Sequence, residues 1–310
     1  RVLNDTLSLG TLVAFISYIR MFFRPIRDLA EKYNILQNAM SSAERILLIL
    51  DTKNNLTKID LQISPPALDR IQEIRLEDVS FSYIGDEKVL KNIHLHIKTG
   101  ETVAVVGPTG AGKTSLVNLI ARFYDPTSGR ILINGIDIRE FDSVVFRDKM
   151  ALVMQEPFLF SGTIRQNIFE NADHITEETV QEIIDAANCR ALIQRLPDGL
   201  ETVLTGGGTS ISSGERQLIS IARAFARNPQ LILFDEATSY IDSQTELWIQ
   251  QALEKLMKNR TAMIIAHRLS TVRHVDRIIV LNRGRIIESG AHTELMDRQG
   301  FYYRLSQFQR

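Results

Sequence analysis

The sequence contains a single cysteine, Cys189, and no surplus of either charge. One cysteine excludes a disulfide framework and any metal site made of several cysteines, and it indicates folding in a reducing compartment. The 36 Lys and Arg residues are balanced by 37 Asp and Glu residues, for a formal net charge of -1. This balance excludes a globally basic nucleic-acid binder and an acidic disordered chain, so we expect no nucleic-acid partner.

The chain has 310 residues, of which 44% are hydrophobic and 24% are charged, which suits roughly two ordinary folded domains. An apolar run over 7–23 would span roughly 25 Å as a helix, close to the ~30 Å hydrocarbon layer of a bilayer. For this run alone, the alternative is a buried helix in a soluble bundle.

A helical seam follows the apolar run. Apolar side chains recur alternately three and four residues apart, at Ile26, Leu29, Tyr33, Leu36, Met40, Ala43, Leu47 and Leu50. This period of 3.5 residues is typical of a helix that packs along other helices. We therefore expect one long membrane-spanning and cytoplasmic helix over 1–50, with Pro25 as its one point of kinking, as a fragment of a larger membrane bundle. The polar segment 51–70, with Pro65 and Pro66, predicts a linker.

A glycine-rich loop follows the last of three expected strands, over 74–83, 89–97 and 102–106. A helical pattern over 115–123 comes next, so the loop has the strand-to-helix context of a phosphate-binding P-loop. Its glycines allow backbone N–H groups to surround phosphate oxygens at a helix N-terminus. Lys113 is expected to reach the β- and γ-phosphates, and the Thr114 hydroxyl to bind Mg²⁺. The expected loop residues are Gly107, Pro108, Thr109, Gly110, Ala111, Gly112, Lys113 and Thr114.

The second half of such a site is an apolar strand that ends in an acid, and 231–236 (LILFDE) has this pattern. Asp235 is expected to hold the metal, generally through water, and Glu236 is placed to polarise an attacking water. An acidic pair after an apolar strand is common by itself. Downstream of a P-loop it strongly favours a nucleotide site.

Together with their flanking segments, these motifs resemble the ATP-binding cassette (ABC) exporters. The resemblance covers 71–310 densely and extends over 7–50 as the family's last transmembrane helix. It implies that Tyr83 is the aromatic A-loop residue that stacks on adenine, and that Ser115 joins the P-loop residues in binding the nucleotide. It also implies that Gln155 is the Q-loop glutamine near Mg²⁺ and the attacking water, and that His267 is the switch histidine at the γ-phosphate.

The resemblance further implies a paired protein. It matches the family's signature loop to Ser212, Ser213, Gly214 and Glu215, and its D-loop aspartate to Asp242. A serine and a helix N-terminus, here before the helical pattern 215–226, bind anions. In the family this loop caps the γ-phosphate of ATP held by a second, head-to-tail domain of an identical or a different chain. Ser213 and Glu215 depart from the family's glycine and glutamine, and Gly206 stands where many exporters carry a glutamate.

The expected fold is α/β, of the P-loop NTPase class. Segments 100–155 and 229–287 predict a RecA-like, mostly parallel sheet with helices on both faces, and 71–98 adds an antiparallel edge. The nucleotide-binding domain extends over 71–310, with a helical subdomain over about 156–228 and a closing helix over 293–308. Phe158, Leu159 and Phe160 are expected to line a socket for short cytoplasmic helices of the membrane domains, with ordinary core as the alternative.

The resemblance implies an ATPase, with ATP and Mg²⁺ as its ligands, that couples hydrolysis to the export of a drug, lipid or peptide. The parent protein would span the plasma or inner membrane beside a second half-transporter, with this domain in the cytoplasm. A soluble ABC ATPase of DNA repair or translation does not fit the apolar run at 7–23. A regulatory subunit with a slow site is distinguished by measuring turnover with and without Glu236.

Overall fold

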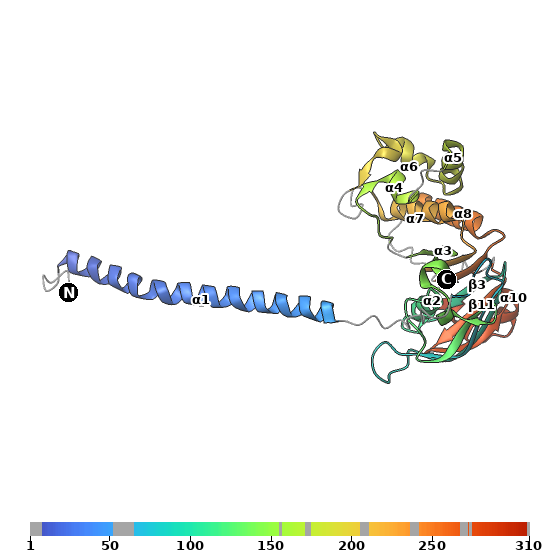
Figure 1. Cartoon of the computed structure of the whole chain (residues 1–310), viewed down its shortest axis with the longest axis horizontal. Helices are drawn as coiled ribbons and strands as arrows, with labels where there is room; N and C mark the ends of the chain where they lie inside the picture. The colour runs from blue at the N-terminus through green and yellow to red at the C-terminus, as the bar shows by residue number, and fades with distance from the viewer. Residues whose placement is uncertain are drawn as a thin grey trace. The chain divides into compact units, whose positions relative to one another are not determined.

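The computed structural model describes residues 8–51, 65–154, 157–170, 175–204, 211–235, 242–266, 272 and 275–308. The chain divides into two compact units, Arg1–Asn55 and Leu56–Arg310 (Figure 1). Among the described residues, every buried hydrophobic side chain belongs to the second unit. The second unit therefore has a hydrophobic core of its own.

The first unit contains a single described helix, α1 (Leu9–Asp51), which includes Pro25. Just before it, the Ser8 hydroxyl accepts a hydrogen bond of 3.1 Å from the backbone N–H of Thr11, which caps the first turn. At 1.5 Å per residue the helix is about 65 Å long. It is long and apolar enough to cross a membrane, and none of its side chains is buried. The long N-terminal helix expected from the apolar run and the seam is confirmed.

In the second unit, an antiparallel sheet has the strand order β2-β1-β4-β5. Its strands are β1 (Glu73–Phe81), β2 (Leu90–Lys98), β4 (Ser128–Ile133) and β5 (Ile136–Asp137). From Ile93 to Ile97, alternate residues of β2 are buried, as the apolar and polar alternation predicts. The antiparallel strands thus form a sheet of their own, and this sheet includes β4 and β5 from a segment expected in the parallel sheet.

The second sheet has the order β12-β11-β3-β10-β9-β6. Its strands are β3 (Thr102–Val106), β6 (Met150–Val153), β9 (Leu231–Asp235), β10 (Thr261–Ile265), β11 (Arg277–Asn282) and β12 (Arg285–Gly290). All neighbours run parallel except β12, which pairs antiparallel with β11. Because parallel strands end at one edge, the carboxyl ends of β3 and β9 lie at the same edge, on either side of β10.

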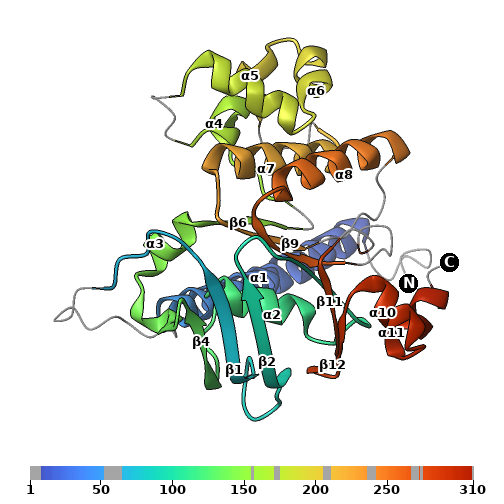
Figure 2. The same ribbon diagram turned by 90° about the vertical axis from the view of Figure 1, so that its right-hand side faces the viewer.

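Helices cover the parallel sheet. One hydrophobic cluster joins it to the antiparallel sheet and α2 (Lys113–Ile120), and a second joins it to a helical layer. That layer contains α4 (Ile164–Ile168), α5 (Glu177–Ala186), α6 (Arg190–Arg195), α7 (Ser213–Arg227) and α8 (Ser243–Met257). Figure 2 shows α4, α5 and α6 stacked on α7 and α8. The smaller elements are η2 (Ile138–Glu140), α3 (Ser143–Asp148), β7 (Gly162–Thr163), η3 (Gly199–Glu201) and β8 (Val203–Leu204).

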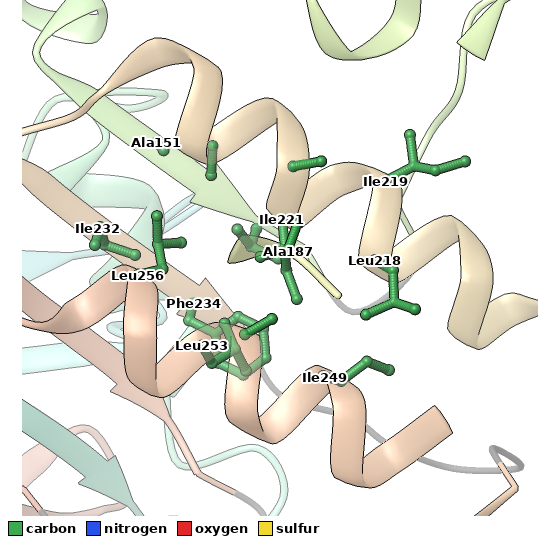
Figure 3. Close-up of a cluster of buried hydrophobic side chains, with 14 of the residues drawn as sticks. Ala151, Ala187, Leu218, Ile219, Ile221, Ile232, Phe234, Ile249, Leu253 and Leu256 are labelled. Carbon is green, nitrogen blue, oxygen red and sulfur yellow. The ribbon is translucent and has the colours of Figure 1, made fainter. Parts of the chain in front are cut away.

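The helical layer is joined to the sheet by apolar side chains. Leu218 of α7 points toward Ile249 of α8, and Leu253 of α8 lies beside Phe234 of β9 (Figure 3). All four side chains are at most 6% exposed. At about 25 cal/mol per Å² of buried apolar surface, each contributes roughly 1.5–3 kcal/mol to folding. These contacts connect α7, through α8, to the strand that ends at Asp235.

The closing helix expected over 293–308 is two helices, α10 (His292–Asp297) and α11 (Phe301–Phe308). The break has a local cause, because Gln299 adopts a left-handed backbone conformation with φ of 48°. The Glu288 carboxylate accepts hydrogen bonds from the backbone N–H groups of Phe301 (2.5 Å) and Tyr302 (2.9 Å). This acid caps α11 from β12 and thereby fixes a second helix start.

Candidate nucleotide site

The glycine-rich loop lies between β3 and α2. Four of the five residues of β3 are buried, and the chain then turns through 107–112 before α2 begins at Lys113. The turn is closed by a hydrogen bond of 3.2 Å from Ala111 N to Pro108 O. The carbonyl of Ala111 accepts a bond of 3.0 Å from Gly284 N, in the turn between β11 and β12. The loop is thus anchored to a neighbouring strand of the sheet.

Two of its glycines are required by close packing. A Cβ atom on Gly107 would lie 2.0 Å from the carbonyl oxygen of Leu281, at the end of β11. Gly112 has a φ of 102°, and a Cβ there would lie 2.8 Å from Leu90 Cδ2. A side chain at either position would move the loop. The glycine spacing therefore serves contact with the two sheets as well as approach to a ligand.

The ammonium group of Lys113 is held over the loop. Its Nζ donates to the carbonyls of Gly107 (2.8 Å) and Pro108 (3.1 Å), and the residue is 6% exposed. Burial lowers the pKa of Lys113, and the charge of Asp235 opposes this effect. A buried cation gains from an anionic partner, because its own hydration has been removed. The loop thus presents a positive charge suited to phosphate.

Thr114 and Asp235 meet at the carboxyl edge of the parallel sheet. Thr114 Oγ1 donates to Asp235 Oδ2 at 3.3 Å, although the residues are 121 positions apart. Hydroxyl and carboxylate oxygens are suitable Mg²⁺ ligands, and this ion is commonly held by one or two carboxylates together with substrate phosphates. Within the described ranges no group of three or more His, Cys, Asp and Glu residues could hold a metal. The pair fits Mg²⁺ that is completed by a nucleotide.

Tyr83 lies beside the helix that follows the loop. Its hydroxyl is 3.1 Å from Ser115 Oγ and accepts from Asn118 Nδ2 at 3.4 Å. Its ring makes edge-on contacts with Phe81, at 4.7 Å between centroids, and with Tyr124, at 5.1 Å. Tyr83 is 46% exposed, so aromatic surface faces outward next to Ser115. The predicted stacking of adenine on this ring stays a prediction.

The signature residues form the start of α7. The Ser212 hydroxyl accepts from Glu215 N at 3.2 Å, and Ser212 N donates to Glu215 Oε2 at 2.8 Å, which is a reciprocal capping box. Arg195 of α6 forms an ion pair with Glu215. The glutamate thus closes the cap with one carboxylate oxygen and meets a cation with the other. Sequence reasoning missed Arg195, because no local pattern places α6 beside the start of α7.

Asp242 occupies the corresponding position before α8. Its carboxylate accepts from Thr245 N at 2.9 Å, and this backbone hydrogen bond lowers the pKa of Asp242. The D-loop aspartate is therefore a helix cap in this chain, and its part in a nucleotide site stays a prediction.

Several predicted positions lie outside the described residues. These are Gln155, Gly206, Glu236 and His267.

The expected socket at 158–160 needs a correction. Leu159 is fully buried in the core, whereas Phe158 and Phe160 are 59% and 62% exposed. The middle residue of the run therefore points inward, and the three apolar side chains do not face one partner together. The exposed part is the pair Phe158 and Phe160, whose rings meet edge-on at 5.2 Å.

The geometry defines a class of protein. A glycine loop between a buried parallel strand and a helix, with lysine and threonine at the helix start and an aspartate at the end of β9, is a P-loop nucleotide-binding domain. The domain also contains the six-stranded sheet and, in the helical layer, the capped helix α7.

The comparisons assign this domain to a family. Residues 90–239 match the ABC transporter family model. The chain is 44% identical over 310 residues to the uncharacterized ABC transporter ATP-binding protein YfiC of Bacillus subtilis, covering 99% of the chain and 51% of that protein. It is 44% identical over 306 residues to a fatty acid ABC transporter ATP-binding/permease protein of Mycobacterium tuberculosis, covering 99% and 48%. It is 42% identical over 309 residues to an ATP-dependent lipid A-core flippase of Syntrophus aciditrophicus, covering 100% and 51%.

A solved structure, a bacterial Atm1-family ABC exporter with ATP bound, matches with a TM-score of 0.77 and 34% identity, covering 98% of this chain and 53% of that one. The chain belongs to the ABC transporter family, and the part that matches the family model is its ATP-binding domain. It spans about half the length of the curated relatives it matches. The α/β fold and the family expected from the motifs are confirmed.

Proposed function

We propose that this chain is the ATP-driven end of an ABC exporter half-transporter, which binds ATP with Mg²⁺ and closes head-to-tail on a second such domain. The observation that carries the proposal is the meeting of Thr114 with Asp235, at 3.3 Å, one residue from the buried ammonium of Lys113. A hydroxyl, a carboxylate and a cation at one edge match the needs of a metal-bound triphosphate.

In the reaction, Lys113 and the N–H groups of the glycine loop bind the β- and γ-phosphates and stabilise the charge that develops on them. Thr114 and Asp235 would hold Mg²⁺, which would neutralise phosphate charge. Glu236 accepts a proton from the water that attacks the γ-phosphorus, while the bond to the β,γ-bridging oxygen breaks to give ADP and phosphate. Gln155 and His267 would contact the γ-phosphate region, as the family resemblance implies.

The start of α7 supplies the second half of the partner's site. Because the Ser212 hydroxyl accepts from Glu215 N, its own hydrogen remains to donate to a phosphate oxygen. Closure would bring this donor to ATP on the second domain, and phosphate loss would release it. The exposed pair Phe158 and Phe160 would receive a cytoplasmic helix of the membrane domain and transmit this motion.

The exposed apolar α1 supports placement of the parent protein in a membrane, with the nucleotide-binding domain on the cytoplasmic side. Relatives are named for fatty acids, for lipid A-core and for multidrug export, so we infer that the exported substrate is an amphipathic lipid or drug. Such a substrate would contact membrane helices, of which this chain contributes one.

The test uses residues 65–310 of the second unit, which contain the described hydrophobic core. With Glu236→Gln to block hydrolysis, we expect ATP and Mg²⁺ to shift the mass from monomer to dimer in light scattering. Addition of Lys113→Ala should abolish the shift. A monomer that still binds ATP would identify the partner as a different chain, and failure to bind ATP would overturn the proposal. In the unaltered chain turnover should exceed that of Glu236→Gln by about 10²-fold or more.

A further inference from the structure

An arginine, Arg223, lies toward the C-terminal end of α7, which we call the signature helix because it begins at the signature residues. Arg223 on α7 reaches across to the segment that carries the exposed pair Phe158 and Phe160. Its Nε donates to Asn167 O at 2.7 Å, and its two terminal nitrogens donate to Phe158 O at 3.3 Å and to Asn167 Oδ1 at 3.2 Å. The guanidinium carbon lies 5.7 Å from the centre of the Phe160 ring. One side chain thus contacts both exposed phenylalanines.

Asn167 completes the connection from α4. Its Oδ1 accepts from Phe160 N at 2.8 Å, and its Nδ2 donates to Phe160 O at 2.9 Å and to Thr163 O at 3.0 Å. The residue is 3% exposed, so these bonds form away from water, where a missing partner is costly. The backbone of Phe160 is therefore bound on both its N–H and its carbonyl by a side chain that Arg223 orients.

The helix between Ser212 and Arg223 is suited to carry a displacement. The two positions are separated by about 16 Å along the helix axis. Between them Leu218, Ile219 and Ile221 are at most 1% exposed, and Leu218 faces α8 (Figure 3), so this stretch of the helix is closely packed. A change at the capped end therefore reaches Arg223 as movement of one rigid element.

We propose that Arg223 is a positioning residue that ties the signature helix to the backbone of Phe158 and Phe160, so that closure over the partner's nucleotide orders this exposed pair. The inference rests on the proposed head-to-tail closure. It adds a defined route from the signature loop to the docking surface, by which we mean the exposed pair Phe158 and Phe160. Arginine is required because its planar fork provides several directed donors, which a lysine ammonium cannot supply in the same directions.

A neighbouring arginine provides a matched control. Arg227 lies one turn further along α7 and is exposed, and its Nη2 pairs with Glu170 at 3.4 Å. An exposed pair of this kind contributes little to stability. Arg227→Gln therefore removes the same charge from the same helix without touching Phe158, Phe160 or Asn167.

The experiment is amide hydrogen exchange on the full-length exporter in lipid nanodiscs, carrying Glu236→Gln, with and without ATP and Mg²⁺. ATP should protect 212–216 in all variants, because that is the site of closure. In the parent and in Arg227→Gln, ATP should also slow exchange at 158–162, by about tenfold. In Arg223→Gln this second protection should be lost, and Arg223→Lys should restore only part of it.

The outcomes separate the two proposals. If 212–216 gains no protection in the parent, the head-to-tail closure fails and the inference fails with it. If 212–216 is protected but 158–162 responds equally in Arg223→Gln and the parent, the closure stands and the role of Arg223 is overturned. The thermal midpoint of each variant identifies a folding defect. Should Arg223→Gln unfold, Asn167→Asp replaces it as the test, because it keeps an acceptor for Arg223 and loses the donors to Phe160 and Thr163.

Discussion

Replacement of Ser212 by alanine tests the most specific feature of the site, a hydroxyl that caps a helix and has a hydrogen left to donate. In the fold, the hydroxyl accepts one backbone bond of 3.2 Å. Loss of such a cap costs about 1 kcal/mol of unfolding free energy. For a unit of this size that lowers the melting temperature by roughly 2–4 °C. The stability effect should therefore be small.

The effect on pairing should be much larger. A hydrogen bond to a charged phosphate oxygen contributes about 1.5–3 kcal/mol, and a symmetric dimer would lose two of them. The dimer dissociation constant should therefore rise by about 10²- to 10⁴-fold. The assay is sedimentation of 65–310 carrying Glu236→Gln, over a range of concentrations, in ATP and Mg²⁺.

Thr176→Ala is the matched control, because Thr176 caps α5 in the same helical layer by accepting from Thr179 N at 3.3 Å. It should lower the melting temperature by a similar amount and leave the dimer dissociation constant unchanged. Equal weakening of the dimer by both variants would trace the effect to folding. An undiminished dimer in Ser212→Ala would refute the assigned role of the signature serine.

Three further predictions concern other parts of the unit. Gly107→Ala should abolish ATP binding, because its Cβ would lie 2.0 Å from Leu281 O. Gly135→Ala is the control, because a Cβ there meets open space, and this variant should still bind ATP. Equal ATP affinity of the two variants by calorimetry would contradict this prediction. Burial raises the pKa of Cys189 to about 12, so a thiol reagent at pH 8 should label it only after unfolding. The thiol loses its proton near pH 9.0 in the unfolded chain but only near pH 12 in the folded chain. Between these pH values the free energy of unfolding should therefore fall by about 1.4 kcal/mol per pH unit. Denaturant titrations of Cys189→Ala should lack this slope. Phe158→Ala should leave ATP binding intact and reduce transport by the reconstituted exporter, and an unchanged transport rate would count against its place at the docking surface.

Much of the fold follows from short-range patterns. Alternation of apolar and polar residues over 74–83 predicts a strand with one buried face, since successive side chains of a strand point to opposite faces. Continuous apolar residues over 102–106 predict a central parallel strand, which is buried on both faces. The break between α10 and α11 was missed, because its cap comes from Glu288, on a different element. The membership of β4 and β5 in the antiparallel sheet was also missed, since pairing partners are not encoded in local alternation.

The candidate site shows the same division. The P-loop residues and Asp235 were predicted from motifs, because phosphate and Mg²⁺ each demand particular groups at particular spacings. The ion pair of Arg195 with Glu215 could not be predicted, and nor could the contacts of Arg223. Those contacts depend on which helix faces lie together after packing.

The amino-acid pattern alone predicts the groups of the site and the local elements that carry them: a glycine loop, a lysine and a threonine at a helix start, an acid after an apolar strand, and a long apolar helix. Three contacts became visible only in the folded chain: Thr114 lies 3.3 Å from Asp235, Leu159 is buried between two exposed phenylalanines, and Arg223 binds the backbone of that pair. The reason is physical. Local conformation depends on neighbouring residues along the chain, whereas these contacts depend on strand order and on close packing between elements far apart in sequence.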